Sequence, residues 1–501
     1  MSSNFKLVRF AAIASLICLL STLSIPASGA PPSTLDDLLT QANLASGAPF
    51  KHHVRSHGVD GAGRSVFLDE EGVASVRRRC NRALCFGLYL DGARLYNTNF
   101  NDTPLPVSGS APMERTYQTI VSYAFTDPSF RRGGGRLAER DPLTAGGRIF
   151  RRITVLPRGG SAMDVSIDEA TSLIASASSI DGTYRFVFGD QRPISGGLTV
   201  PFAIDLNGKP FDRFDAREES ADRLEPPAGL LPQFAGASGG ADMLKKDRPI
   251  VACTIGGITV PCLLDTGNSG MAMSLELAEA LRLEPMETAA EVRGVGSYLT
   301  GVTKAPPITI AGCTLPSALY TILHDIHGYG YDVVLGADAF AHARVTIDYP
   351  KKRVTVAPST DVADPHPLAV AFESFIPIVD MELADVDVRL MIDTGDDSGI
   401  NLADDYYAQH RTLFKPTGKS RIGGAGGTAE QITGEIPSVR IAGFTLEHQK
   451  IGAQKQTARI ADGHLGNGFL AHFAVVFDYA RARVAFEPRS GDASIKTELS
   501  H

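Results

Sequence analysis

Short apolar stretches separated by turn residues dominate the chain after residue 30. Phe150 to Leu156, Met163 to Ile167 and Tyr184 to Phe188 are stretches of this kind, with Gly, Asp and Ser between them. This pattern predicts short strands joined by turns. The segment Thr34 to Leu39 instead predicts a short capped helix. We therefore expect residues 35–234 to form an N-terminal β-rich domain, built mainly as one curved antiparallel sheet.

A second hydrophobic pattern occurs twice. Strand-like stretches at Ile250 to Ile255 and Ile258 to Leu264 recur at Ile378 to Leu383 and Val386 to Ile392. Matched positions stay in step over the rest of both segments, so that Ala341-His342 recurs as Ala471-His472. This internal repeat predicts two β lobes of one design, at residues 247–360 and 368–490. A fold that is mainly β follows.

Each repeat carries the tripeptide Asp-Thr-Gly directly after its second strand. The copies are Asp265-Thr266-Gly267 and Asp393-Thr394-Gly395. One copy would be a weak signal, typical of a polar turn, but matched surroundings argue against that interpretation. If the turns meet, the two carboxylates share a proton, so one acts as base and the other as acid. Asp265 and Asp393 are therefore the candidate catalytic residues.

Composition limits the class of protein. The chain has 501 residues, 43% hydrophobic and 21% charged, which indicates a globular protein of about three domains. Its 50 Gly and 30 Pro favour turn-rich β structure. The formal net charge of −8 argues against a nucleic-acid partner. The short run Arg77-Arg78-Arg79 indicates a solvated face instead.

The first thirty residues predict an export signal. Lys6 and Arg9 precede an apolar stretch from Phe10 to Ile25, and Ser28-Gly29-Ala30 provides a small-residue cleavage site. An uncleaved membrane anchor is the alternative, although serines interrupt the stretch. No later stretch is long and apolar enough to cross a bilayer. We expect an exported protein, periplasmic or secreted, with residues 1–30 as its signal peptide.

Cysteine usage agrees with export to an oxidising compartment. Five cysteines follow the predicted signal: Cys80, Cys85, Cys253, Cys262 and Cys313. Disulfides are possible there, and a bond between Cys80 and Cys85 would close a short loop. The odd count leaves at least one unpaired. Without a Cys-x-x-Cys or a matching His spacing, no metal site is expected.

The boundaries between units are rich in Pro, Gly and Ala. The stretch from Glu225 to Gly240 has this composition, and residues 235–246 are expected to be a linker. A second boundary falls near residues 361–367. About 20 residues separate the last strand of one repeat from the first of the next, which permits closure within one molecule. A monomer is favoured, and a homodimer with exchanged lobes stays possible.

The two repeats resemble retropepsin-like aspartic protease domains, of the exported bacterial kind, arranged in tandem. The resemblance spans residues 247–488 and rests on three motifs in each repeat. The motifs are the Asp-Thr-Gly turn, a hydrophobic-hydrophobic-Gly element and a glycine-rich flap. The last two occur as Val334-Leu335-Gly336 with His464-Leu465-Gly466, and as Gly294-Val295-Gly296 with Gly424-Ala425-Gly426-Gly427.

This resemblance implies a bilobal acid-protease fold in which two β-barrel lobes meet face to face. A water between Asp265 and Asp393 would attack a peptide carbonyl, without metal or other cofactor. Thr266 and Thr394 would hydrogen-bond across the lobe interface and support the two aspartates, beside Gly267 and Gly395. The implied partner is a peptide or protein substrate.

The same resemblance implies that the flap hairpins close over an extended peptide. The glycines at their tips would bind its backbone, and these are Gly294, Gly296, Gly424 and Gly426. Tyr298 could lean over the cleft as a flap tyrosine does. The alternative for Tyr298 is ordinary half-buried packing.

Two residues depart from the family pattern. The position after Asp-Thr-Gly is usually Ser, Thr or Ala, but here it is Asn268 in one repeat and Asp396 in the other. Asp396, followed by Asp397, could raise the pKa of the aspartate pair by repulsion. Alternatively, the side chains of Asn268 and Asp396 point to solvent.

The N-terminal domain carries a weaker resemblance, on Arg158-Gly159-Gly160 before one strand and Asp168-Glu169-Ala170-Thr171 after it. It is similar to domains that precede some exported bacterial aspartic proteases and have a half-barrel shape. The leading hypothesis for the chain is thus an exported aspartic endopeptidase. The alternative is a catalytically inactive protease fold that binds peptides or lipids in the cell envelope.

Overall fold

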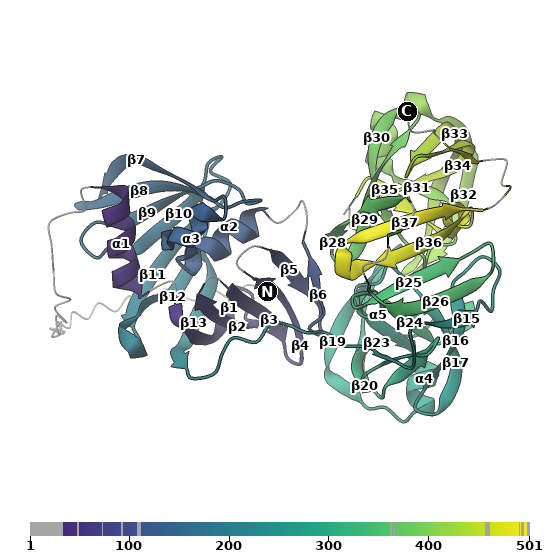
Figure 1. Ribbon diagram of the computed structural model, residues 1–501, viewed down its shortest axis with the longest axis horizontal. Helices are drawn as coiled ribbons and strands as arrows, with labels where there is room; N and C mark the ends of the chain where they lie inside the picture. The colour runs from purple at the N-terminus through teal and green to yellow at the C-terminus, as the bar shows by residue number, and fades with distance from the viewer. Residues whose placement is uncertain are drawn as a thin grey trace, which may run out of the picture.

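The computed structural model shows two bodies joined side by side, both built mainly of β-strands (Figure 1). It describes residues 34–497 except 48–49, 73, 92–93, 108–111, 361–362, 365, 456–460, 490 and 492–494. The predicted signal peptide, residues 1–30, lies outside the described residues. The prediction of a mainly β protein is confirmed.

The N-terminal body is one antiparallel sheet of thirteen strands that curves around three helices (Figure 1). Each strand pairs with the next along the chain except β6 and β7, which form the two edges of the sheet, and the first strand also pairs with the last. The strands are β1 (Phe50–Asp60), β2 (Ser65–Gly72), β3 (Ala74–Asn81), β4 (Leu84–Leu90), β5 (Leu95–Thr98), β6 (Pro104–Pro106), β7 (Arg136–Ala145), β8 (Arg148–Leu156), β9 (Met163–Asp168), β10 (Ile174–Ser179), β11 (Arg185–Pro193), β12 (Thr199–Leu206) and β13 (Lys209–Ser220).

The helices of this body cover one face of the sheet. They are α1 (Leu35–Ser46), α2 (Pro112–Val121) and α3 (Pro128–Arg132). The capped helix predicted at residue 34 is present: the Thr34 hydroxyl accepts from the Asp37 N–H at 3.1 Å, while Asp37 accepts from the Thr34 N–H. Leu38 of α1 and Ile120 of α2 pack into one core with Val165 of β9.

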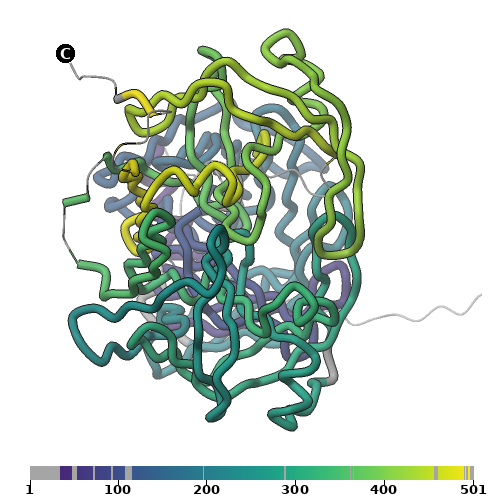
Figure 2. Tube along the Cα trace, turned by 90° about the vertical axis from the view of Figure 1, so that its right-hand side faces the viewer, coloured from purple at the N-terminus to yellow at the C-terminus, as the bar shows by residue number. Residues whose placement is uncertain are grey.

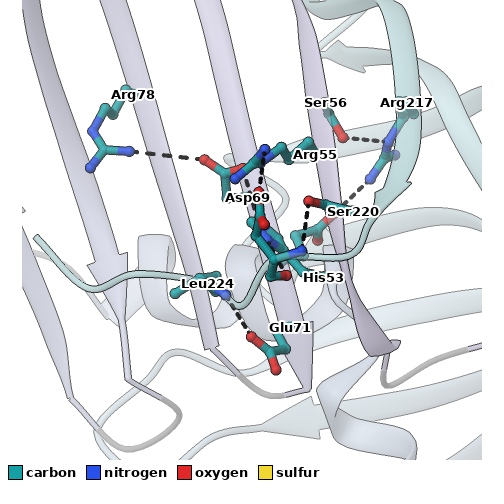
Figure 3. Close-up of polar contacts among 11 residues, drawn as sticks. His53, Arg55, Ser56, Asp69, Glu71, Arg78, Arg217, Ser220 and Leu224 are labelled. Atoms are coloured by element: carbon teal, nitrogen blue, oxygen red, sulfur yellow. Dashed lines mark hydrogen bonds and ion pairs between the residues drawn. The ribbon is translucent and has the colours of Figure 1, made fainter.

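Charged side chains are also buried in the N-terminal sheet (Figure 3). The Arg217 guanidinium donates to Glu70 at 2.6 Å and to the Ser56 hydroxyl at 2.9 Å. Burial raises the pKa of Glu70 to about 7, although the charge of Arg217 opposes the shift. Nearby, His53 contacts Asp69 at 3.0 Å, beside a cavity of about 440 Å³ at the end of β13. This cavity is remote in sequence from both Asp-Thr-Gly turns.

The second body contains three sheets. A ten-stranded sheet is built mainly from the first repeat: β14 (Gln233–Phe234), β16 (Ile250–Ile255), β17 (Ile258–Leu264), β18 (Met271–Ser274), β19 (Pro285–Arg293), β20 (Ser297–Ala305), β21 (Ile308–Ile310), β22 (Cys313–Leu315), β23 (Ala318–Leu323) and β24 (Val333–Leu335). A nine-stranded sheet comes from the second repeat and the chain end: β28 (Ala371–Glu373), β29 (Ile376–Leu383), β30 (Val386–Ile392), β31 (Ile400–Ala403), β32 (Lys415–Gly424), β33 (Gly427–Ile441), β34 (Phe444–Gln454), β35 (Gly463–Leu465) and β38 (Ile495–Thr497).

A third sheet joins the repeats. Its six strands are β15 (Gly239–Asp242), β26 (Arg353–Pro358), β25 (Ala343–Asp348), β36 (Phe473–Asp478), β37 (Arg483–Pro488) and β27 (Pro367–Ala369), with β25 of one repeat antiparallel to β36 of the other. Short helices α4 (Leu275–Ala280), α5 (Ala337–Phe340), α6 (Asp404–Gln409) and α7 (Asn467–Leu470) flank the sheets. Viewed from its outer side, the body shows the two repeats adjacent, with the N-terminal body behind them (Figure 2).

The repeats have the same topology. In the first, β17 runs parallel to β24, and β18 lies antiparallel to β24 and parallel to β23. In the second, β30, β35, β31 and β34 repeat these three pairings. The strands predicted from the repeated apolar pattern are present as β16, β17, β29 and β30.

The predicted linker needs a correction. Residues 239–242 form β15, which pairs with β26, so this part of residues 235–246 is a strand of the joining sheet. This strand pairs through its backbone, as any residue can, but its Gly and Ala residues have the composition that is typical of a linker. Among the described residues two disulfides are present, Cys80–Cys85, which closes the short loop noted as possible, and Cys253–Cys262 between β16 and β17, while Cys313 is free and buried. In the described part of the chain, no helix has the length and apolarity needed to cross a membrane.

Candidate active site

Each Asp-Thr-Gly turn leaves a strand that is held between its neighbours. The Asp265 N–H donates to the Leu335 carbonyl at 2.9 Å, and the Asp393 N–H donates to the Leu465 carbonyl at 2.9 Å. The strands before the turns are largely buried, since Leu263, Leu264, Leu390 and Ile392 are at most 1% exposed. Both aspartates therefore start from rigid strand ends rather than from loops.

The two turns are locked together by their threonines. The Thr266 N–H donates to the Thr394 Oγ1 at 3.0 Å, and the Thr394 N–H donates to the Thr266 Oγ1 at 3.1 Å. Each hydroxyl then donates to a carbonyl of the opposite repeat, Ile392 or Leu264, at 2.7 Å. Four buried hydrogen bonds thus fix the relative position of the turns.

The carboxyl groups of Asp265 and Asp393 meet at this junction, since each lies against the glycine of the opposite turn. The Gly267 N–H donates to Asp265 at 2.8 Å, and the Gly395 N–H donates to Asp393 at 2.9 Å. A side chain at either glycine would overlap the carboxylate of the opposite repeat. Glycine is required here for close approach.

Burial and mutual repulsion shift the titration of this pair. Burial, followed by the charge of Asp393, raises the pKa of Asp265 well above its ordinary value. Burial and the charge of Asp396 also raise the pKa of Asp393, while His464 opposes the shift. Both shifts favour the protonated forms, and one proton shared by the two carboxyl groups would meet the requirement for joint acid and base action.

An arginine of the first repeat contacts the second turn. Arg248, which directly precedes the first repeat's opening strand, pairs with Asp397 at 2.7 Å and donates to the Gly395 carbonyl at 3.1 Å. Its guanidinium also lies 5.4 Å from the centre of the Tyr331 ring. Its positive charge lowers the pKa of Asp265, against the larger effect of burial.

Asp396 is part of the site and does not point to solvent. Its carboxylate accepts from His464 Nε2 at 2.8 Å, from the Ser398 N–H at 2.8 Å and from the Ser398 hydroxyl at 2.5 Å. Burial favours the neutral forms of both partners, but their hydrogen bond and attraction prevail, so the pKa of Asp396 is lowered and that of His464 raised. The predicted repulsion of Asp393 by Asp396 is present, and His464 partly offsets it.

The sequence did not identify His464 as part of the site. It stands where the first repeat has Val334, and Asp396 stands where that repeat has Asn268. Both positions carry an ionisable residue in the second repeat and an uncharged one in the first, and this paired difference could have identified His464. Asn268 is half-buried, and its side-chain oxygen Oδ1 accepts from the Gly270 N–H at 3.4 Å.

The glycine-rich hairpins meet tip to tip. The tip Gly294-Val295-Gly296 connects β19 and β20, and Ala425-Gly426 connects β32 and β33. The Gly296 N–H donates to the Ala425 carbonyl at 3.0 Å. Gly426 has a φ of 83°, and a side chain there would overlap the backbone of the opposite tip.

Tyr298 lies near the start of β20, two residues after the first tip, and is half-buried. Burial and the charge of Asp325 raise its pKa. This agrees with the packing interpretation of Tyr298, and no described contact joins it to either catalytic turn.

A cavity of about 430 Å³ adjoins the second turn. It lies between Ser398 to Ile400, the hairpin β32–β33 and β34. Gly399, Gly434 and Gly452 leave space in its lining, while Glu435 and Lys450 contribute opposite charges.

Residues 251–339 match the aspartyl protease family model. The matched span contains the first Asp-Thr-Gly turn, the first glycine-rich tip and Val334-Leu335-Gly336. The match supports an aspartyl protease domain, hence a hydrolase acting on peptides. No curated protein matches the sequence.

Proposed function

We propose that this protein is an exported aspartic endopeptidase in which Asp265 and Asp393 together activate a water molecule. One observation carries the proposal: two half-buried carboxyl groups, one from each repeat, lie against the glycine of the opposite turn, between turns that are locked by Thr266 and Thr394.

The mechanism follows from the shared proton. The ionised carboxylate takes a proton from water as the oxygen attacks the peptide carbonyl, and the protonated carboxyl donates its proton to the carbonyl oxygen. The carboxyl group that took the proton from water then donates it to the leaving nitrogen as the carbon–nitrogen bond breaks, and the other carboxylate takes a proton back from a hydroxyl group of the tetrahedral intermediate. No covalent intermediate with the protein forms.

The surrounding residues are assigned supporting roles. The glycine tips of both hairpins offer backbone groups that can pair with an extended peptide, and their closure would exclude water. The cavity beside Ser398 would receive a substrate side chain. Because the two turns meet within a single chain, we favour a monomer with a bilobal, pepsin-like arrangement over a homodimer with exchanged lobes.

Export is supported by two features. The predicted signal peptide precedes the described residues, and both disulfides are of a kind that persists in oxidising compartments. We therefore place the mature protein in the periplasm or outside the cell.

The test is hydrolysis of an unfolded protein by the mature chain and by Asp265→Asn and Asp393→Asn. We expect both substitutions to abolish turnover while the fold is retained. Full activity in either variant would contradict the shared pair. Peptide binding without turnover by the unaltered protein would favour the inactive, peptide-binding alternative.

A further inference from the structure

The two catalytic turns are held in place by different neighbours. In the second repeat, Asp396 and Ser398 are held within their own repeat: the Gly468 N–H donates to the Ser398 carbonyl at 2.8 Å, and Asp396 binds Ser398 and His464. The residue of the first repeat that corresponds to Gly468 is Asp338. Gly468 binds within its own repeat, whereas Asp338 is bound by the N-terminal body.

Asp338 is a buried carboxylate, 1% exposed, on the short helix α5. Its hydrogen-bond donors all come from the N-terminal body, from the loop 99–103 between β5 and β6. The amide groups of Asn99 and Asn101 donate to it at 2.9 Å and 2.8 Å, and the Thr103 hydroxyl donates as well. Burial raises the pKa of Asp338, and these three hydrogen bonds oppose the shift.

Loop 99–103 also reaches the catalytic turn itself. Asn99 Nδ2 donates to the Ser269 carbonyl at 2.8 Å, and Ser269 follows Asp265 by four residues. The ring of Phe100 lies against Gly270, where a side chain would overlap it. Asn101 pairs with both backbone groups of Leu319 on β23, at 2.8 Å and 3.1 Å.

The loop is preorganised for this contact. The Asn99 side-chain oxygen accepts from the N–H groups of Asn101 and Thr103, at 3.0 Å and 3.1 Å. Asn99 and Thr103 are 1% and 0% exposed. Leu105 and Leu230 from the same side belong to the hydrophobic core of the second body. Strands β5 and β6 face the second body in Figure 1.

The buried contacts of loop 99–103 oppose separation of the N-terminal body from the second body. Separation of the two bodies would leave the Asp338 carboxylate without its three donors in an apolar setting, which is costly. It would also free the segment Asn268 to Gly270, because Asn99 and Phe100 contact it from one side while Gly336 and Ala337 contact it from the other.

We propose that loop 99–103 is a positioning element for the first catalytic turn, with Asn99 as its central residue. The N-terminal body is then a built-in part of the peptidase, not an inhibitor that processing removes. The expected effect on turnover rests on the proposed function, whereas the placement of the turn by loop 99–103 is independent of it.

The test compares full-length mature variants. Asn99→Ala removes the donor shared by Ser269 and Asp338, and Thr103→Val removes one further donor with little change of shape. For Asn99→Ala we expect kcat to fall about tenfold to a hundredfold with KM nearly unchanged, as for a misplaced catalytic group. Asn97→Ala is the matched control, since no described side-chain contact joins Asn97 to the second body. It should leave kcat unchanged.

Hydrogen–deuterium exchange supplies a readout independent of turnover. In Asn99→Ala the amides of residues 267–271 should exchange faster, and those of residues 395–399 should keep the rate of the unaltered protein. If Asn99→Ala does not fold, Asp338→Gly replaces it, because this substitution places the second repeat's residue at the position and leaves no unpaired charge. It should show the same local exchange and the same loss of kcat.

Unchanged kcat together with unchanged exchange would overturn the inference. If the unaltered protein hydrolyses no peptide, the proposed function fails, and the exchange of residues 267–271 still decides whether the loop positions this turn. Faster exchange spread equally over both turns would also contradict the inference, because it would indicate general destabilisation.

Discussion

Thr266 and Thr394 exchange backbone-to-hydroxyl hydrogen bonds of 3.0 Å and 3.1 Å across the junction of the two repeats. Both side chains are buried, at 1% and 0% exposure, and each hydroxyl also donates to a carbonyl of the opposite repeat. The threonines therefore determine how closely the two carboxyl groups can approach.

Replacement of either threonine by valine should loosen this junction. Thr266→Val removes the acceptor for the Thr394 N–H and the donor to Ile392, so buried polar groups lose partners at about 1–3 kcal/mol each. We expect a lower midpoint of urea unfolding and a marked loss of kcat/KM. Thr266→Ser, which retains the hydroxyl, is the control. Equal unfolding midpoints for the valine and serine variants would argue against this role.

The glycines of the turns should be intolerant of even one methyl group. In Gly267→Ala and Gly395→Ala, the new Cβ would overlap the opposite carboxylate, so the pair must separate. Activity should fall by about a hundredfold or more, since small displacements at a reacting centre have effects of this size. Gly328→Ala, in the same repeat but with open space around its Cβ position, should retain activity.

The aspartate pair should make the protein less stable as the pH rises. Because the pKa of Asp265 is raised above 3.8 on folding, the folded state binds more protons than the unfolded state between the two values, and stability falls with pH in that window. Asp265→Asn should therefore be more stable than the unaltered protein at pH 7, and the difference should vanish below about pH 3.8. Thermal unfolding measured from pH 3 to 8 checks this. A destabilised Asp265→Asn at pH 7 would contradict it.

The same pair should produce a pH-dependent turnover. Hydrolysis requires one shared proton, so kcat/KM should fall at low pH when both groups are protonated and at high pH when both are ionised. Because burial raises both pKa values, the optimum should lie higher than for two exposed carboxyl groups. A pH–rate profile on one peptide substrate measures this.

The role of the His464–Asp396 pair can be tested by replacing both residues with their counterparts in the first repeat. His464→Val removes the group that lowers the pKa of Asp393, so the acidic limb of the profile should move to higher pH. It also leaves Asp396 without its cation, at a cost of up to about 3–5 kcal/mol, reduced by the partial exposure of Asp396. The double variant His464→Val/Asp396→Asn recreates Val334 and Asn268 of the first repeat, and should recover most of that stability.

The sign of the pH effect follows from both partners. The raised pKa of His464 contributes stability that is complete below about 6.5 and lost as the pH rises through its folded value. The lowered pKa of Asp396 contributes stability that is present above 3.8 and lost as the pH falls through its folded value. The stability difference between the unaltered protein and the double variant should therefore be largest between about pH 4 and 6.5. A pH-independent difference would exclude an ion pair.

Local pattern was sufficient to predict many of the elements. The apolar stretches before Asp265 and Asp393 mark β17 and β30 because hydrophobic residues recur at the positions that each strand buries. Thr34 and Asp37 identify the start of α1 because a helix end needs acceptors for its free N–H groups. Residues 239–242 were misjudged as linker, since Gly and Ala carry no side-chain pattern that indicates a strand.

The sequence by itself determined that two equivalent Asp-Thr-Gly turns exist, because a repeat is a property of residue order and is visible without coordinates. Only the tertiary structure decided what surrounds each turn. His464 and Asp396 are 68 residues apart and Asn99 and Ser269 are 170 apart. No local periodicity links such positions, since their contact depends on how whole sheets pack. That packing makes the two turns unequal, since the N-terminal body contacts the first turn through Asn99, while Asp396 beside the second turn is held by His464 of its own repeat.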